Sequence, residues 1–156
     1  MREQPMVTIE PAGENDLARV VELIDLGAVG RDPSAAAPPV TDQHLAALRA
    51  IRSTPGCELY VARLGGETVA TFQFAILPNI SNGGRPVAQL ESLPVAAAWR
   101  GRGIGEQLLQ FAVARARAAG CFRLQLTSNK ARVDPHRFYE RFGFTSSHEG
   151  MKLTLD

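Results

Sequence analysis

The amino-acid sequence predicts a single domain of the α/β class that spans residues 1–156. Three observations support this prediction. The 156 residues are 45% hydrophobic, which is enough apolar material for one continuous core. Runs of strand-forming residues alternate along the chain with segments whose apolar residues recur at helical spacing. The sequence contains no internal repeat and no low-complexity tract that would separate two domains.

The N-terminal third of the chain is predicted to hold one short strand and two helices. Apolar and polar residues alternate over residues 7–9, which indicates a strand. Asn15 or Asp16 can cap a first helix, and Thr41 or Asp42 can cap a second one. The apolar residues predicted to share the inward face of the first helix are Leu17, Val20, Val21 and Ile24.

A β-hairpin and a further strand are predicted in the middle of the chain. Residues 58–64 and 68–77 are rich in strand formers, and Gly65 and Gly66 between them suit the positive φ angles of a tight turn. The next strand is predicted over residues 87–95, after an irregular loop.

Two helices and two strands are predicted in the last third. Residues 103–119 form a helix that ends at a glycine, and residues 122–126 return as a strand. A shorter helix over about 135–142 leads to a last strand at 152–155. The long helix is predicted to bury Ile104, Leu108, Phe111, Ala112 and Ala116.

Composition argues against several classes of function. The 17 Lys and Arg residues nearly balance 16 Asp and Glu residues, and a formal net charge of +1 disfavours a general nucleic-acid binder. No apolar stretch approaches the roughly 20 residues of a membrane span. Cys57, Cys121 and the 3 scattered histidines match no metal or redox spacing. We therefore expect a cytoplasmic protein with free thiols, no bound metal and no membrane partner.

A glycine-rich run between a predicted strand and a predicted helix indicates an anion site. The first N–H groups of a helix have no acceptor within it, and the helix dipole adds positive potential there. Glycines let the backbone approach phosphate oxygens closely, and arginines add charge. The simpler alternative is a tight turn alone. The run is Arg100-Gly101-Arg102-Gly103-Ile104-Gly105.

Two common phosphate-binding motifs do not fit this run. A dinucleotide fingerprint needs a third glycine or alanine and an acidic residue about 20 residues later. In either register the third position is Glu106 or Leu108, and Gln125 lies downstream. The nucleoside-triphosphatase loop needs Gly-Lys followed by Ser or Thr, which the sequence lacks. The phosphate therefore belongs to another kind of ligand.

The sequence resembles the GNAT superfamily of N-acetyltransferases from about Leu90 to Phe144. The pyrophosphate motif of that family is Arg or Gln, any two residues, Gly, any residue, and Gly or Ala. Arg100, Gly103 and Gly105 meet it. Residues 90–95 resemble the central strand of the family, and Trp99 holds the aromatic position before the arginine. Further matches to a second cofactor motif lie at Asn129 and at residues 136–144.

The resemblance implies a fold and a co-substrate. The family fold is a mixed, mostly antiparallel sheet of six or seven strands, flanked by about four helices and splayed at the central strands. Acetyl-CoA is implied as co-substrate, with its pantetheine in the gap. Backbone groups of Leu93 and Val95 would hold the pantetheine, and amides of residues 102–105 the pyrophosphate. The second cofactor motif adds Asn129, Phe138 and Tyr139.

Pro94 departs from the family pattern, which commonly has a β-branched residue there. Proline donates no ladder hydrogen bond, so the strand is expected to fray at this point. The alternative is that proline suits the splay, because the N–H that it lacks would face the gap.

Glu91 and Tyr139 are the candidate catalytic residues. An amine with a pKa of about 10 is protonated at neutral pH, so attack on a thioester needs a proton acceptor. Glu91 is the candidate acceptor, or else an ordinary surface glutamate. A backbone N–H would stabilise the oxyanion. Tyr139 resembles the family tyrosine that protonates the departing thiolate, or else it packs among phenylalanines. His136 is a weaker candidate for the acceptor pocket.

The predicted function is transfer of acetyl from acetyl-CoA to a primary amine, with a small molecule as the expected acceptor. A non-catalytic CoA-binding or sensor domain and a protein N-acetyltransferase are the alternatives. The acceptor would be chosen by the second helix and by loops at 31–40 and 78–86. Dimers are common among relatives, so a homodimer is one expected state.

Overall fold

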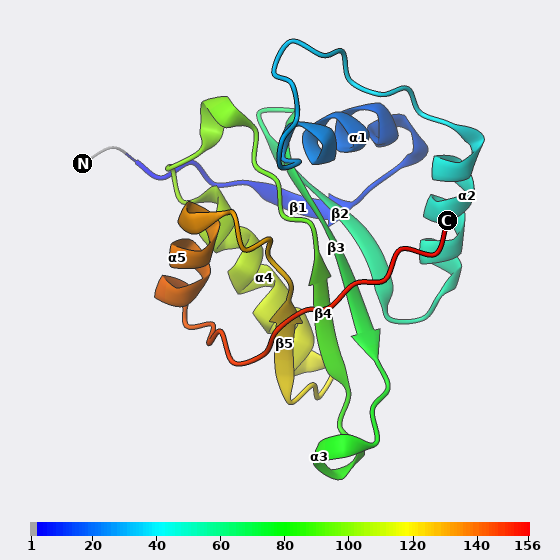
Figure 1. The fold of residues 1–156 in the computed structure, drawn as a ribbon, viewed down its shortest axis with the longest axis vertical. Coiled ribbons are helices and arrows are strands. Elements are labelled where there is room, and N and C mark those ends of the chain that lie inside the picture. The colour runs from blue at the N-terminus through cyan, green and yellow to red at the C-terminus, as the bar shows by residue number, and fades with distance from the viewer. Residues whose placement is uncertain (1–2) are drawn as a thin grey trace. The chain divides into compact units, whose positions relative to one another are not determined.

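The computed structural model describes residues 3–156, which form two compact units (Figure 1). The larger unit runs up to Leu126, and the smaller unit is Thr127–Asp156. The larger unit contains the whole sheet and the glycine-rich run, whereas the smaller unit contains the segment around Tyr139. The fold of each unit is described separately.

The larger unit is built on a sheet of five strands that lie in sequence order. Neighbouring strands are antiparallel from the first to the fourth, and the fifth is parallel to the fourth. The mixed, mostly antiparallel sheet is therefore confirmed, although it has five strands and not six or seven. The strands are β1 Thr8–Pro11, β2 Cys57–Leu64, β3 Glu67–Leu77, β4 Val87–Glu91 and β5 Arg123–Leu126.

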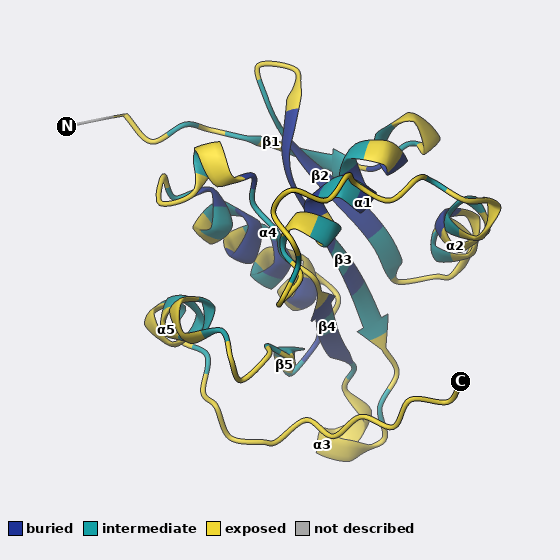
Figure 2. Cartoon of the chain, turned by 45° about the horizontal axis from the view of Figure 1, so that its top comes forward, coloured by how far each residue is buried: buried dark blue, intermediate teal, exposed yellow. Residues whose placement is uncertain are grey.

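The helices of this unit cover both faces of the sheet. Helices α1 (Leu17–Leu26) and α2 (Asp42–Ser53) pack on one face, and α4 (Ile104–Ala118) packs on the other (Figures 1 and 2). The loop between β3 and β4 contains α3 (Ser81–Gly84), a single turn interrupted by left-handed residues. The turn between β2 and β3 is the predicted glycine pair, at φ 57° and 86°.

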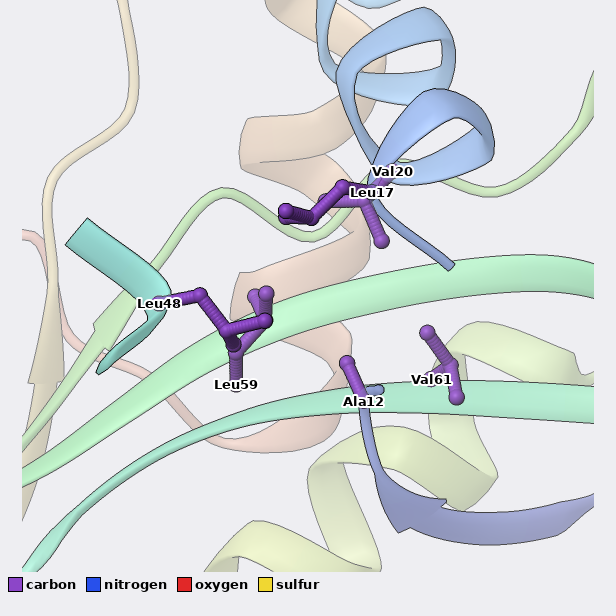
Figure 3. Packing of buried hydrophobic residues seen from close by; sticks show 6 residues of the cluster. All are labelled: Ala12, Leu17, Val20, Leu48, Leu59 and Val61. Carbon is purple, nitrogen blue, oxygen red and sulfur yellow. The ribbon is translucent and has the colours of Figure 1, made fainter. Parts of the chain in front are cut away.

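One core lies between the sheet and the first two helices. Figure 3 shows side chains from α1 and α2 meeting those of β2 above the strands. Leu23 is buried in α1, whereas Ile24, predicted to face inward, is 41% exposed. Thr41 caps α2 as predicted, since its Oγ1 accepts from the N–H of His44 at 3.4 Å. The labelled core residues are Ala12, Leu17, Val20, Leu48, Leu59 and Val61.

A second core lies between the sheet and α4. Tyr60 and Phe72 stack with ring centroids 5.1 Å apart, and Phe111 of α4 meets Tyr60 edge-on at 5.0 Å. Adjacent residues of a strand point to opposite faces, so Tyr60 faces α4 while its neighbours Leu59 and Val61 face the other core. Of the five predicted inward residues of α4, Ile104, Leu108, Ala112 and Ala116 are buried, and Phe111 is half-buried against Tyr60.

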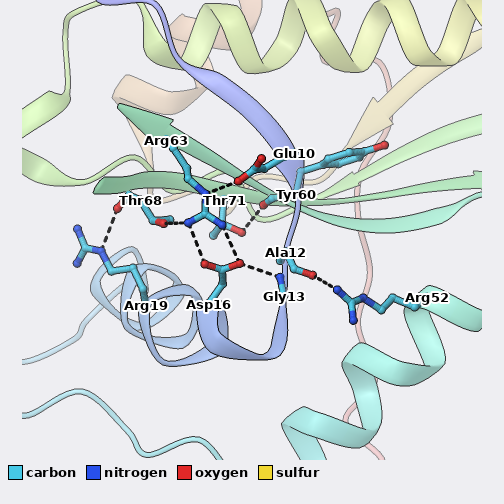
Figure 4. Close-up of polar contacts among 10 residues, drawn as sticks. All are labelled: Glu10, Ala12, Gly13, Asp16, Arg19, Arg52, Tyr60, Arg63, Thr68 and Thr71. Carbon is cyan, nitrogen blue, oxygen red and sulfur yellow. Dashed lines mark hydrogen bonds and ion pairs between the residues drawn. The ribbon is translucent and has the colours of Figure 1, made fainter. Parts of the chain in front are cut away.

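Arg63 ties the start of α1 to the sheet (Figure 4). Its two terminal nitrogens contact the two carboxylate oxygens of Asp16 at 2.9 and 3.0 Å, and its Nε is paired with Glu10. Nη1 also donates to Thr68 Oγ1 at 2.8 Å. The hydrogen bonds from Arg63 hold the pKa of Asp16 below its ordinary value of 3.8. A bidentate pair of this kind fixes orientation as well as position.

The smaller unit consists of α5 (Val133–Phe142) and an extended C-terminal segment. Helix α5 ends at Gly143, where φ is 121°. The predicted strand at residues 152–155 is wrong, since these residues adopt no regular structure. Their alternating pattern favours a strand only where another strand pairs with the backbone. No such pairing occurs in the described chain, and Met151, Leu153 and Leu155 are 91%, 83% and 89% exposed.

Candidate active site

Strand β4 contains a bulge immediately after Glu91. Glu91 lies opposite Gln73 of β3, and the next paired residue, Val95, lies opposite Ala70. Two residues of β3 therefore face the three residues that follow β4, one more than regular pairing allows, which is the defining feature of a β-bulge. Ser92 takes up the distortion with φ at 50°. Bulges of this kind redirect side chains and end strand pairing.

The sheet loses a neighbour at the bulge. The parallel pairing of β4 with β5 ends at the pair Leu90 and Leu126. Beyond that point β3 is the one strand of the described sheet that pairs with this segment, through Ala96 N–H to Val69 O at 2.8 Å and Thr71 N–H to Pro94 O at 3.3 Å. Polar groups of successive strand residues point to opposite sides. The N–H and C=O of Val95 therefore point away from β3, toward the side that β5 has left.

The N–H that Pro94 lacks is not missing from the side of the strand that β5 no longer borders. Its carbonyl accepts from Thr71, and the nitrogen and carbonyl of one extended residue point to the same side. The missing N–H of Pro94 therefore faces β3, which contradicts the idea that it faces the splay. The strand predicted over residues 87–95 is too long, because β4 ends at Glu91, before Pro94, and only the bridge at Val95 follows. Leu93 lies inside the bulge.

The glycine-rich run forms the turn into α4. Residues Ala97–Trp99 make a 3-10 turn, and Gly101 and Gly103 then adopt φ values of 71° and 80°. The first helical bond runs from Gln107 N–H to Gly103 O at 3.2 Å. The N–H groups of residues 104–106 therefore have no acceptor within the helix, and the positive end of the helix dipole lies beside them. This is the arrangement that binds phosphate groups.

Both arginines of the run contact their own loop. Arg100 Nε donates to Val95 O at 3.0 Å, so it links the run to the bulged segment. The Arg102 guanidinium lies 4.9 Å from the ring centroid of Trp99. Both residues are exposed, so their positive charge reaches the solvent in front of the loop.

The N-terminal segment packs against this loop, which sequence reasoning missed. Gln4 Nε2 donates to Gly103 O at 3.1 Å, and a Cβ added at Gly103 would lie 2.0 Å from that nitrogen. Gln107 holds the same segment through Val7 N–H at 3.1 Å and Pro5 O at 2.7 Å. No local pattern links Gln4 to a residue 99 positions away.

Glu91 lies beside a small hollow of about 40 Å³ on the face that carries α1 and α2. Glu91 is exposed, and its strand partner Gln73 shares its side of the sheet. Ile24 of α1 forms one wall, which explains why this apolar side chain is not buried in the core. The full lining consists of Ile24, Leu59, Thr71, Phe72, Gln73, Glu91 and Ser92.

The smaller unit gathers the other predicted residues around α5. Tyr139 lies between two aromatic rings, with centroids 5.3 Å from Phe138 and 5.7 Å from Phe144. Burial raises the pKa of Tyr139 above its ordinary value of 10.0, which keeps the hydroxyl protonated at neutral pH. Asn129 forms a local turn, accepting from Ala131 N–H at 2.9 Å through its side-chain oxygen.

His136 contacts the same turn. Its Nε2 lies 3.1 Å from the backbone oxygen of Asn129. The two predicted cofactor motifs thus belong to different units: Glu91, residues 93–95 and 100–105 to the larger one, and Asn129, Phe138 and Tyr139 to the smaller one.

Two further observations concern metals and membranes. Among residues 3–156, no three His, Cys, Asp or Glu side chains gather as metal ligands would. Within the same range, no helix has both the length and the apolar character needed to span a bilayer. The two cysteines, Cys57 and Cys121, are free thiols, and burial raises the pKa of Cys121.

Comparison with known proteins identifies the class. A model described as "Acetyltransferase (GNAT) family" matches residues 28–144, so the chain belongs to the GNAT acetyltransferase family. It is 29% identical over 121 residues to glucosamine 6-phosphate N-acetyltransferase of Trypanosoma brucei brucei. The aligned residues cover 76% of this chain and 80% of that relative. It is 42% identical over 62 residues to aminoalkylphosphonate N-acetyltransferase of Salmonella typhimurium, 40% of each chain.

A solved structure confirms the fold over nearly the whole chain. The crystal structure of a transcriptional regulator from Bacillus halodurans C-125 matches with a TM-score of 0.87 and 36% identity, over 96% of this chain and 100% of the other.

Proposed function

We propose that this protein transfers the acetyl group of acetyl-CoA to the primary amine of a small molecule. The observation that carries the proposal is the order of structural features along one stretch of the chain. A bulged strand with Glu91 beside a hollow is followed by a turn whose free N–H groups begin α4. The hollow gives room for the amino group of an acceptor next to a carboxylate, and the turn suits the CoA diphosphate.

The proposed reaction uses groups of this chain at each proton transfer. Glu91 accepts a proton from the ammonium, and the free amine forms a C–N bond to the thioester carbon. The Val95 N–H, on the open side of the strand, stabilises the oxyanion. Collapse breaks the C–S bond, and the thiolate takes a proton from the Tyr139 hydroxyl. The extra proton on the new amide nitrogen restores that hydroxyl, and Glu91 releases its proton to solvent. The products are the acetylated amine and coenzyme A.

The names of two relatives guide the choice of acceptor. Both glucosamine 6-phosphate and aminoalkylphosphonates are small amines that carry a phosphorus oxyanion. We propose small amines of this kind as the first acceptors to test. The two units are proposed to work as one domain, because the family match at residues 28–144 runs across the boundary between them.

Release of free thiol tests the proposal. Purified protein is mixed with acetyl-CoA and a panel of amines that includes D-glucosamine 6-phosphate and 2-aminoethylphosphonate. We expect thiol release with at least one amine, and Glu91→Gln is expected to lower kcat by roughly 10²–10⁴-fold. Undiminished turnover in that variant would remove Glu91 from the mechanism. Light scattering on the same material measures whether the protein is a homodimer.

A second candidate is a non-catalytic CoA-binding sensor. It is favoured by the 36% identity to a protein described as a transcriptional regulator. Calorimetry separates the two functions, because a sensor binds CoA with no thiol release for any amine of the panel.

A further inference from the structure

A chain of hydrogen-bonded side chains crosses from β5 to β4 and ends on Glu91. Arg123 Nε donates to Gln125 Oε1 at 2.9 Å, and Gln125 Nε2 donates to Gln89 Oε1 at 2.8 Å. Gln89 Nε2 then donates to Glu91 Oε1 at 3.3 Å. Gln89 and Gln125 are paired in the register of the two strands. All four side chains therefore lie on one face, the face that carries α1, α2 and the hollow.

The two ends fix the direction of this chain. A guanidinium can only donate and a carboxylate can only accept, so each glutamine must turn its oxygen toward Arg123 and its NH₂ toward Glu91. The orientation of Gln89 is fixed a second time, because its Nε2 also donates to the backbone oxygen of Leu90 at 3.3 Å. With two donated bonds and one accepted bond, the Gln89 amide has its main hydrogen-bonding groups in use. Reversing either amide would set two oxygens or two NH₂ groups against each other.

We propose that Gln89 is the positioning residue for Glu91, and that Gln125 holds Gln89 in the orientation this requires. The inference rests on the proposed function, in which Glu91 takes the proton of the amine. The bond from Gln89 occupies one carboxylate oxygen, Oε1. It limits rotation of an otherwise exposed side chain and leaves Oε2 to receive the proton. Arg123 acts at the far end and touches neither Glu91 nor the hollow.

Kinetics of a double-mutant cycle test this role. Gln89→Leu keeps the approximate volume and removes the donor, and it is expected to lower kcat about tenfold, because small misplacements of a catalytic group are costly. KM for acetyl-CoA should not change. Gln125→Leu should lower kcat by a smaller factor, about threefold. In a Glu91→Ala background, Gln89→Leu should lower kcat by less than about twofold, since no carboxylate remains to be positioned.

The matched control is Gln110→Leu. Gln110 Nε2 donates to Glu106 Oε1 at the same 3.3 Å, but on the exposed side of α4. This variant leaves the Glu106 backbone N–H unchanged and loses the same kind of side-chain bond away from Glu91 and the hollow, so it should keep full kcat. Its melting temperature should match that of Gln89→Leu, which separates a positioning effect from a folding defect.

A measurement independent of turnover completes the test. In ¹H–¹⁵N spectra, Glu91→Ala should move the side-chain amide signals of Gln89 and Gln125 together and leave that of Gln110 in place. Unmoved Gln89 signals would show that the hydrogen bond from Gln89 to Glu91 does not form, and the proposal would fall. Two outcomes would overturn positioning while leaving Glu91 as the proposed base. One is full kcat in Gln89→Leu together with a low kcat in Glu91→Ala. The other is an equal loss of kcat on Gln89→Leu in the wild-type and Glu91→Ala backgrounds. Full kcat in Glu91→Ala would instead overturn the base, and positioning with it.

Discussion

Asp16 and Arg63 make the stability of the protein depend on pH. The Asp16 side chain is 14% exposed and accepts two bonds from Arg63, which lower its pKa. A carboxyl with a depressed folded-state pKa contributes stability above its unfolded-state pKa, and that contribution is lost as the pH falls through the folded-state value.

Asp16→Asn is therefore expected to lower the free energy of unfolding at pH 7 by roughly 1–3 kcal/mol. The difference from the wild type should begin to shrink near about pH 4, where the unfolded-state carboxyl protonates, and should be lost as the pH falls through the lower folded-state pKa. Urea unfolding at both pH values measures it. Glu14→Gln serves as the control, because its partner Arg49 lies 3.1 Å away on an exposed surface and such pairs contribute little. A constant difference across pH would contradict the assignment.

Tyr139 has an aromatic environment that fits both of its proposed roles, packing and proton donation. Tyr139→Phe keeps the ring contacts with Phe138 and Phe144 and removes only the hydroxyl. We expect kcat to fall about 10²-fold, with little change in the affinity for CoA, because only the protonation of the thiolate is affected. Tyr60→Phe, in the core beside Phe72, is the control and should keep its turnover. Equal kcat in wild type and Tyr139→Phe would leave packing as the sole role.

At the scale of elements, the start of α4 depends on a glycine with a left-handed backbone. Gly103→Ala faces two costs, a left-handed backbone and a Cβ 2.0 Å from Gln4 Nε2. Gly120→Ala, just after the same helix, faces only the first, because φ is 75° and no atom lies within 4 Å. Each replacement should destabilise by about 1–2 kcal/mol through the backbone alone.

The two glycine variants should therefore differ in CoA binding and not in backbone strain. We expect Gly103→Ala to weaken CoA binding at least about tenfold, because relief of the strain at a φ of 80° would displace the N–H groups that would receive the diphosphate. Gly120→Ala should bind as the wild type does. Isothermal calorimetry on both variants gives the comparison, and an unchanged Gly103→Ala affinity would argue against diphosphate binding at this helix end.

Elements with local determinants could be predicted from the sequence, and those without could not. The glycine pair between β2 and β3 and the Thr41 cap depend on adjacent residues, so both predictions hold. The strand expected at 152–155 needs a neighbour that no pattern in the segment supplies. The bulge after Glu91 arises from a register against β3, and Ile24 is exposed because of a hollow lined by residues of α1, β2, β3 and β4.

The same distinction applies to the candidate site of the whole molecule. The turn at residues 100–105 could be predicted because strand, glycines and helix follow one another directly. Gln4 lies 99 residues from Gly103, and Gln89 lies 36 residues from Gln125, so only the folded chain brings these pairs together. Sequence alone could not show that the nitrogen of Pro94 faces β3, because this follows from the hydrogen bond between Thr71 and Pro94.

Binding of CoA should stabilise the whole molecule. A ligand that binds only the folded state at 100 times its Kd adds about 2.7 kcal/mol, which corresponds to roughly 5–10 °C in Tm for a chain of this size. Differential scanning calorimetry measures the shift. Pantetheine, which lacks the diphosphate, should produce a much smaller shift at the same concentration. Equal shifts would mean that the diphosphate contributes no affinity.

The hydrogen bond between Gln4 and the first turn of α4 has a practical consequence for anyone who expresses the protein. An affinity tag or fusion partner joined at residue 1 of this sequence lies close to Gln4, which contacts the turn at residues 100–105. Motion of the tag would displace the N-terminal residues, and Gln4 would pass this displacement on to the turn at residues 100–105. Titrations on tagged material should therefore report weaker CoA binding than titrations after the tag has been cleaved, and cleaved protein is the proper reference for every variant.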